Sequence, residues 1–214
     1  NYALSLLLFS IFHYICLLSK TNKMQEFINY LQDNLQLSSL QTEFLKTQIV
    51  PQHFKKGEIR VNPSEFDEQI YYIKKGGCRS FYLKDGKDIT FSFAFESNLL
   101  ISVRSKLTKK DYPEIIEFLE DTEAFSLKLL PFDELCKDYP QFARFSLTIL
   151  YRYNTFLEER IINLQCKTAK ERYEWLLSKY PKLLQKATLG HIASFLGITP
   201  ETLSRIRADK SYNI

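Results

Sequence analysis

The chain has 214 residues, which is enough for a buried core and for two small domains. With 45% hydrophobic and 25% charged residues, its composition excludes an intrinsically disordered protein and is typical of a globular one. The net charge is only +4, but from Lys167 onward nine basic residues stand against four acidic ones. The whole excess of positive charge therefore lies near the C-terminus, where it favours an anionic partner.

An apolar run, YALSLLLFSIFHYICLL, occupies residues 2–18. It has no basic residue before it and no small-residue cleavage site after it, so it is a poor signal peptide. Its length is at the short limit for a membrane span. The single methionine, Met24, stands where an amphipathic helix begins. We expect translation to start there, with residues 1–23 as upstream sequence; a membrane anchor is the alternative. The protein is expected in the cytoplasm, without a membrane partner.

After this leader the pattern predicts an α+β protein in three parts. Residues 24–139 should form a jelly-roll-like antiparallel β-roll preceded by two short helices, over 25–33 and 39–49. Residues 140–166 should form a long dimerisation helix, and residues 167–214 a C-terminal helical domain.

Strand signals fill the stretch QIYYIKKGGCRSFYLKDGKDITFSFAF, residues 69–95. Aromatic residues and Ile alternate with polar ones there, and the runs break at Gly76-Gly77 and at Asp85-Gly86. The later stretch IIEFLEDTEAFSLKL predicts another hairpin, turning at Glu120-Asp121. Short antiparallel strands at this spacing favour a roll or barrel.

The long helix, from about Pro140 to Leu164, carries an apolar seam. The seam residues are spaced alternately by three and four: Leu147, Leu150, Asn154, Leu157, Ile161 and Leu164. This is the pattern of a coiled coil, in which a single polar residue such as Asn154 costs stability and fixes register. A second stripe could pack on the roll: Phe142, Phe145, Ile149 and Phe156. Because a helix with two apolar faces needs two partners, the pattern predicts a homodimer.

In the C-terminal segment, the stretch 168–181 predicts a helix that ends before Pro181. Two short helices joined by a tight turn are predicted after it. Gly197 suits the left-handed conformation of such a turn. Thr199 is a good N-cap and Pro200 suits the first helical position. The sequence therefore predicts a helix-turn-helix.

The second of these helices has one polar face. At 100° per residue Leu203 and Ile206 point inward, and three polar residues share the opposite side: Glu201, Ser204 and Arg205. Arg can bind guanine, Glu can accept from cytosine and Ser can serve either, so these three are the predicted base-reading residues. Residues at the flanks are better placed for the DNA backbone: Thr199, Thr202, Arg207, Lys210, Lys182 and Lys186.

The motif GHIASFLGITPETLSRIR resembles the helix-turn-helix of Crp/Fnr-type bacterial transcription regulators, whose recognition helix typically reads E-T-x-S-R. Residues 53–95 are similar to the first half of their cyclic-nucleotide-binding-like β-roll, and residues 140–164 to their dimerisation helix. The resemblance implies a homodimeric transcription regulator that binds double-stranded DNA at a pseudo-palindromic site. RNA polymerase is a further candidate partner. By position it gives Glu201, Ser204 and Arg205 the base-reading role.

The chain departs from the cyclic-nucleotide binders of this family, which carry a Gly-Glu pair and an Arg-Ser/Thr pair. Glu96 has no glycine before it, and Tyr112-Pro113-Glu114 stand where the arginine is expected. Spacing does not support Arg104 as a substitute. Without that guanidinium a cyclic phosphate is poorly compensated. We therefore expect a divergent member that does not bind cAMP and whose small-molecule effector is unknown.

Few residues in the sequence support an enzyme active site or a metal site. Neither a metal site nor a cofactor is expected, because the four cysteines are scattered and lack the spacing of metal ligands: Cys16, Cys78, Cys136 and Cys166. Paired carboxylates, a nucleophile elbow and a phosphate-binding glycine loop are missing from the sequence, and we expect no enzyme. The alternative to a DNA-binding regulator is a ligand-sensing or scaffold module whose helix-turn-helix contacts protein.

Overall fold

The computed structural model describes residues 24–32, 38–61, 69–101, 114–128 and 140–209. Residues 24–32 are helical. The strands are β1 Ile49–Phe54, β2 Ile59–Val61, β3 Gln69–Lys75, β4 Gly77–Lys84, β5 Lys87–Phe95, β6 Leu99–Ile101, β7 Ile115–Phe118 and β8 Thr122–Lys128. The other helices are α2 Ser39–Gln48, α4 Pro140–Cys166, α5 Ala169–Lys179, α6 Leu183–Lys186, α7 Leu189–Leu196 and α8 Pro200–Ala208. The predicted α+β fold class and antiparallel β-roll are confirmed.

Two four-stranded sheets form the roll, in the orders β1-β8-β3-β6 and β2-β7-β4-β5. Every strand pair is antiparallel. Apolar side chains from both sheets meet between them, and the rings of Phe54 and Phe118 stack with centroids 4.0 Å apart. Ile73 and Ile116 are fully buried in the same cluster. The alternation of inward apolar residues thus produces the core of the roll.

The turns of the roll follow the glycine signals. Asp85 and Gly86 both have positive φ, 52° and 74°, as a two-residue hairpin turn between β4 and β5 requires. Gly76, with φ 95°, instead connects β3 in one sheet to β4 in the other. A Cβ at Gly76 would lie 2.6 Å from Thr122 Oγ1, so this crossing has room only for glycine.

The hairpin predicted at Glu120-Asp121 is wrong. Strands flank this turn, but β7 belongs to the second sheet and β8 to the first, so the chain crosses between sheets there. The two crossings lie together, because Gly77 N donates to Thr122 Oγ1 over 3.1 Å. Alternation predicts a strand and its buried face, but not the partner with which that strand pairs.

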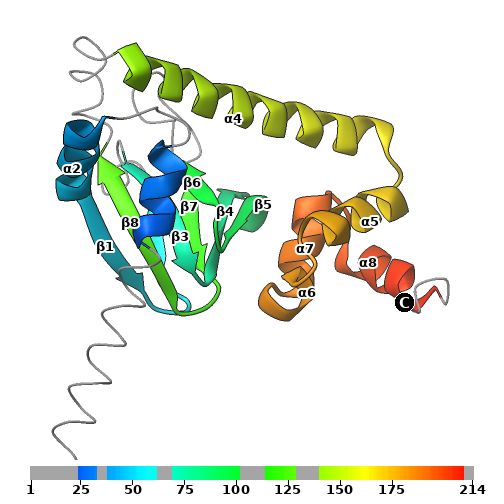
Figure 1. Cartoon of the computed structure of the whole chain (residues 1–214). Coiled ribbons are helices and arrows are strands. Elements are labelled where there is room, and N and C mark those ends of the chain that lie inside the picture. The colour runs from blue at the N-terminus through cyan, green and yellow to red at the C-terminus, as the bar shows by residue number, and fades with distance from the viewer. Residues whose placement is uncertain (1–23, 33–37, 62–68, 102–113, 129–139, 210–214) are drawn as a thin grey trace, which may run out of the picture.

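Helix α4 runs from the roll to the C-terminal helices, which we call the head (residues 168–209) (Figure 1). Ile149 is buried in a cluster with the first sheet and with Phe27 of the N-terminal helix. The ring of Phe156 packs edge-on against Phe91 of β5, with centroids 5.7 Å apart. The expected packing of the second stripe on the roll is thus seen for Ile149 and Phe156; the side chains of Phe142 and Phe145 lie outside the described part.

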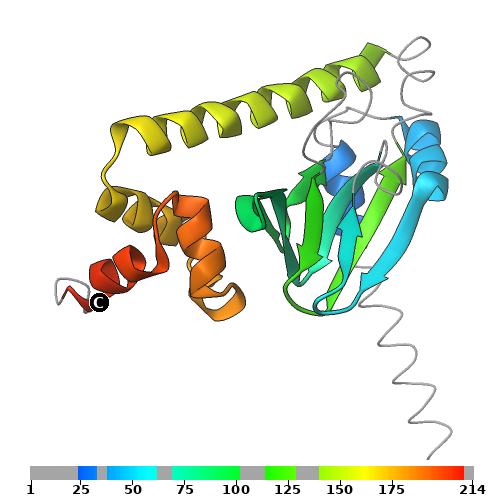
Figure 2. The same ribbon diagram turned by 180° about the vertical axis from the view of Figure 1, so that it is seen from behind.

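The head packs on the outer edge of β5, as the view from behind shows (Figure 2). Ser194 of α7 accepts from Thr90 N over 2.9 Å and donates to the carbonyl of Asp88 over 3.0 Å. The rings of Phe93 and Phe195 lie 5.3 Å apart in a cluster shared by the roll and the head. Helix α7 therefore covers a strand edge that would otherwise expose unpaired backbone groups.

Among the helices that the structure describes, none combines the length and apolar character needed to cross a bilayer. The apolar run at 2–18 lies outside the described residues, and the prediction for it stays a prediction.

Candidate nucleic-acid interface

Helices α7 and α8 and the turn between them form the predicted helix-turn-helix. Gly197 ends α7 in the left-handed conformation, with φ 65° and ψ 38°. The Thr199 hydroxyl caps α8 by accepting from Thr202 N over 3.2 Å, and Pro200 occupies the first turn. Leu203 is completely buried and fixes α8 against the rest of the head. Each of these local features follows from the residue that the sequence places there.

The outward face of α8 is polar and open. Glu201, Ser204 and Arg205 are exposed, as the helical periodicity predicts. Hydrogen bonds from the backbone N–H of Glu201 and from the Thr199 hydroxyl lower the pKa of the Glu201 carboxyl. Glu201 is therefore ionised at neutral pH and acts only as an acceptor. Arg205 reaches Thr202 Oγ1 at 3.4 Å, which leaves most of its guanidinium donors for a ligand.

The flanking residues differ in how available they are. Arg207 and Lys182 are exposed, whereas Thr202 is half-buried. Lys186 turns towards the roll, pairs with Glu120 and lies over the Phe95 ring at 5.3 Å. In the single chain the charge of Lys186 thus serves the contact between head and roll, and its assignment to the DNA backbone stays a prediction. Lys210 lies outside the described residues.

Arg160 joins the long helix α4 to the head, and the sequence reasoning missed it. Its guanidinium donates to the Phe195 carbonyl near the end of α7 over 2.9 Å and lies 3.8 Å from the centroid of the Phe195 ring. Burial lowers the pKa of Arg160 to about 10, so the group stays charged at neutral pH. A second link pairs Lys179 with Glu159 at 2.5 Å. An Arg beside an apolar seam gives no sequence signal for this role, because its partner is 35 residues away along the chain.

The seam of α4 is largely open in the single chain. The exposed fractions are 53% for Leu147, 47% for Leu150, 55% for Ile161 and 43% for Leu164. Asn154 is exposed and Leu157 is half-buried. Large apolar side chains in a row on one helix face are unusual for a monomer.

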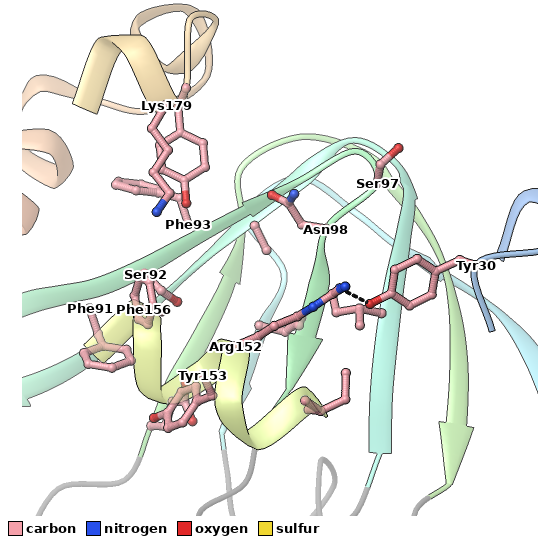
Figure 3. A pocket seen from close by; sticks show the side chains of 16 residues that line it. Tyr30, Phe91, Ser92, Phe93, Ser97, Asn98, Arg152, Tyr153, Phe156 and Lys179 are labelled. Atoms are coloured by element: carbon pink, nitrogen blue, oxygen red, sulfur yellow. Dashed lines mark hydrogen bonds between the residues drawn. The ribbon is translucent and has the colours of Figure 1, made fainter. Parts of the chain in front are cut away.

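A pocket of about 410 Å³ lies where β5, α4 and α5 meet (Figure 3). Figure 3 shows Arg152 extending from α4 towards Tyr30, and its Nη1 donates to the Tyr30 hydroxyl over 2.6 Å. Glu114, at the position where the resemblance leads one to expect the phosphate-binding Arg-Ser/Thr pair, is 7% exposed and lines the pocket. Tyr112, Pro113 and Arg104 lie outside the described residues. No sequence pattern predicts this pocket, because the residues of its wall are spread from Tyr30 to Tyr180.

Within the described ranges, His, Cys, Asp and Glu do not gather in any group of three that could hold a metal ion. Cys78 is buried, which raises the pKa of its thiol to about 12, and Cys166 is exposed.

A two-sheet roll, a long helix with an open apolar seam and a helix-turn-helix head define the architecture of a Crp/Fnr-type regulator, and the chain has this fold. No family model matches the sequence. The chain is 24% identical over 164 residues to the transcriptional activator protein Anr of Pseudomonas protegens. It is 23% identical over 163 residues to the transcriptional activator protein FnrA of Stutzerimonas stutzeri. Each match covers 71% of this chain but only 66% of the relative, slightly under two thirds of its length.

Solved structures agree on the fold. FixK2 from Bradyrhizobium japonicum superposes with a TM-score of 0.63 and 21% identity, covering 76% of this chain and 84% of that one. A protein of Eubacterium rectale assigned to the Crp/Fnr family gives a TM-score of 0.65 and 21% identity, covering 82% of this chain and 83% of that one. The resemblance found in the sequence is confirmed.

Proposed function

We propose that the chain is a sequence-specific DNA-binding transcription regulator that acts as a homodimer in the cytoplasm and is not an enzyme. The observation that carries this proposal is α8: a capped helix, anchored by the buried Leu203, that presents Glu201, Ser204 and Arg205 to solvent. The surplus of basic residues after Lys167 and the names of the relatives, which are transcriptional activators, support it.

In this proposal α8 enters the major groove by its N-terminal half. Arg205 binds O6 and N7 of a guanine, Glu201 accepts from the N4 amino group of a cytosine, and Ser204 bonds to either kind of base. The backbone contacts come from Thr199, Thr202, Arg207, Lys182 and Lys210, which position the helix without selecting sequence.

The seam of α4 would pair two such chains. Leu147, Leu150, Leu157, Ile161 and Leu164 would pack against their copies, and Asn154 would fix the register. The symmetry of the pair would place the two copies of α8 in successive major grooves, roughly 34 Å apart, on a pseudo-palindromic site. RNA polymerase is a further partner in this scheme.

The proposed effector is not cAMP. Glu114 stands at the position where the resemblance leads one to expect the phosphate-binding Arg-Ser/Thr pair, so the arginine of that pair is not present there to compensate a cyclic phosphate.

The test is binding of purified protein to fluorescent duplex DNA over a range of salt concentrations. A DNA-binding regulator loses affinity steeply as salt rises, because binding releases counterions from the phosphates. A protein whose helix-turn-helix contacts another protein would show no such binding, and that result would reject the proposal.

Arg205→Ala and Arg207→Ala make a matched pair of variants on α8. Arg205→Ala should cost about 1–3 kcal/mol of binding free energy and relax the preference at one base pair. Arg207→Ala should weaken binding equally on all sequences and reduce the salt dependence. If Arg205→Ala behaves as Arg207→Ala does, Arg205 contacts phosphate and does not read a base.

A further inference from the structure

Arg160 of α4 contacts Phe195 of α7 in two ways. Its Nη1 donates to the Phe195 carbonyl over 2.9 Å, and its guanidinium carbon lies 3.8 Å from the centroid of the Phe195 ring. That carbonyl belongs to the last turn of α7, where carbonyls lack partners within their own helix. A charge-assisted hydrogen bond and a cation–π contact made by one planar group fix both its position and its tilt. Arg160 therefore holds the end of α7 in one orientation relative to α4.

A second point of α4 lies against the turn of the helix-turn-helix. A Cβ added to Gly197 would lie 3.1 Å from Leu164 Cδ2, so α4 and the turn approach closely. Leu164 follows Arg160 by four residues, which is about one turn of α4, and Gly197 follows Phe195 by two. Two contacts at successive turns of α4 define the direction of the helix-turn-helix as well as its distance from α4.

The head passes this constraint on to α8. Helices α5, α7 and α8 gather at the end of α4 (Figure 1). Phe195 is 1% exposed, and its ring lies parallel to that of Trp175 in α5 with centroids 6.4 Å apart. Leu203 of α8 is completely buried in the same cluster. Because a close-packed core resists internal rearrangement, a displacement of Phe195 relative to α4 displaces α8 as well.

Arg160 is also next to the seam of α4, since Ile161 directly follows it and Leu164 lies one turn further on. In a two-fold dimer paired through this seam, the seam lies along the symmetry axis. We propose that Arg160 is a positioning residue, which fixes the separation of the two copies of α8 and thereby the spacing of half-sites that the dimer accepts. This inference rests on the proposed function and adds to it a determinant of half-site spacing.

Half-site spacing is a sharp criterion for a rigid dimer. A helical turn of DNA takes about 10.5 base pairs and 34–36 Å, so one inserted base pair moves a half-site by about 3.4 Å and rotates it by about 34°. A dimer whose heads are held in place must strain to follow both changes. The bond from Arg160 resists that strain only up to its own strength, which is about tenfold in an equilibrium constant for one charge-assisted hydrogen bond.

The experiment selects bound duplexes from a random pool in parallel with three full-length proteins: the unaltered chain, Arg160→Gln and Arg144→Gln. Arg144→Gln is the matched control, because Arg144 is an exposed cation near the start of α4. All three proteins should recover the same half-site, and one spacing should predominate for the unaltered chain and the control. Arg160→Gln should recover spacings one base pair longer or shorter about tenfold more often.

Two results of these selections would overturn the proposal. One is an equal distribution of spacings for Arg160→Gln and Arg144→Gln. The other is loss of the half-site itself by Arg160→Gln, because Arg160 would then maintain the fold of the head and not its position.

Hydrogen exchange at Thr90, measured without DNA, separates this inference from the proposed function. Thr90 N donates to Oγ of Ser194, the neighbour of Phe195, so protection at Thr90 reports whether α7 stays in place. Arg160→Gln should speed this exchange about tenfold, and Arg144→Gln should leave it unchanged. Unchanged exchange in Arg160→Gln would overturn the proposal. Faster exchange in Arg160→Gln, beside selections that stay random for all three proteins, would instead reject the proposed function and the role in spacing with it.

Discussion

Replacing Leu150 by Glu tests whether the seam of α4 is a dimer interface. Leu150 is 47% exposed in the single chain, so about half of its side chain is available for burial by a partner. Full burial of a leucine is worth roughly 1.5–3 kcal/mol, so the second half contributes about 1 kcal/mol in each copy.

In a two-fold symmetric interface the energetic effect of a substitution is doubled, because both copies carry it. Leu150→Glu therefore removes about 2 kcal/mol of apolar burial. It also brings two carboxylates towards each other in a desolvated layer of the seam, which adds to the loss. The dissociation constant of the dimer should rise by roughly 30-fold from burial alone, and further from repulsion.

Sedimentation equilibrium over a range of protein concentrations measures this constant. Thr155→Glu is the matched control, since Thr155 is exposed on the same helix but off the seam. The control should associate as the unaltered chain does, whereas Leu150→Glu should be mainly monomeric. Equal dissociation constants for the two variants would show that the chains associate through another surface.

Two further predictions concern the contact between head and roll. Ser194→Ala leaves the buried N–H of Thr90 without its partner, which should cost about 1–3 kcal/mol and speed hydrogen exchange at Thr90; unchanged exchange would mean that the head does not cover β5 in solution. Burial, together with nearby Arg79, lowers the pKa of His191 below its ordinary 6.5, so the unfolded chain binds a proton more readily than the folded one. The neutral ring therefore contributes its stability fully above about pH 6.5 and loses it as the pH falls further. On acidification the Tm should drop more in the unaltered chain than in His191→Gln. Parallel curves of Tm against pH for the two proteins would contradict this.

Local chemistry explains which parts of the fold could be predicted. Gly197, Thr199 and Pro200 each carry a conformational preference that acts within one or two residues, so the turn and the start of α8 followed from the sequence. Asp85-Gly86 marked the β4–β5 hairpin for the same reason.

Long-range partners explain what was missed. The change of sheet at Glu120-Asp121 depends on the strands with which β7 and β8 pair. The alternation of apolar and polar residues does not predict those partners. The position of Lys186 depends on Glu120, which lies 66 residues earlier in the chain. The pocket likewise needs Tyr30, Arg152 and Tyr180 together, and no periodicity joins residues so far apart.

The central claim is that the protein reads DNA sequence as a symmetric pair of helices. Selection of bound duplexes from a random pool tests it most directly. The account predicts enrichment of a pseudo-palindrome whose half-sites lie about one helical turn apart, with a guanine contact that Arg205→Ala relaxes. A pool that stays random after repeated rounds, at a salt concentration where the protein still binds DNA, would contradict it.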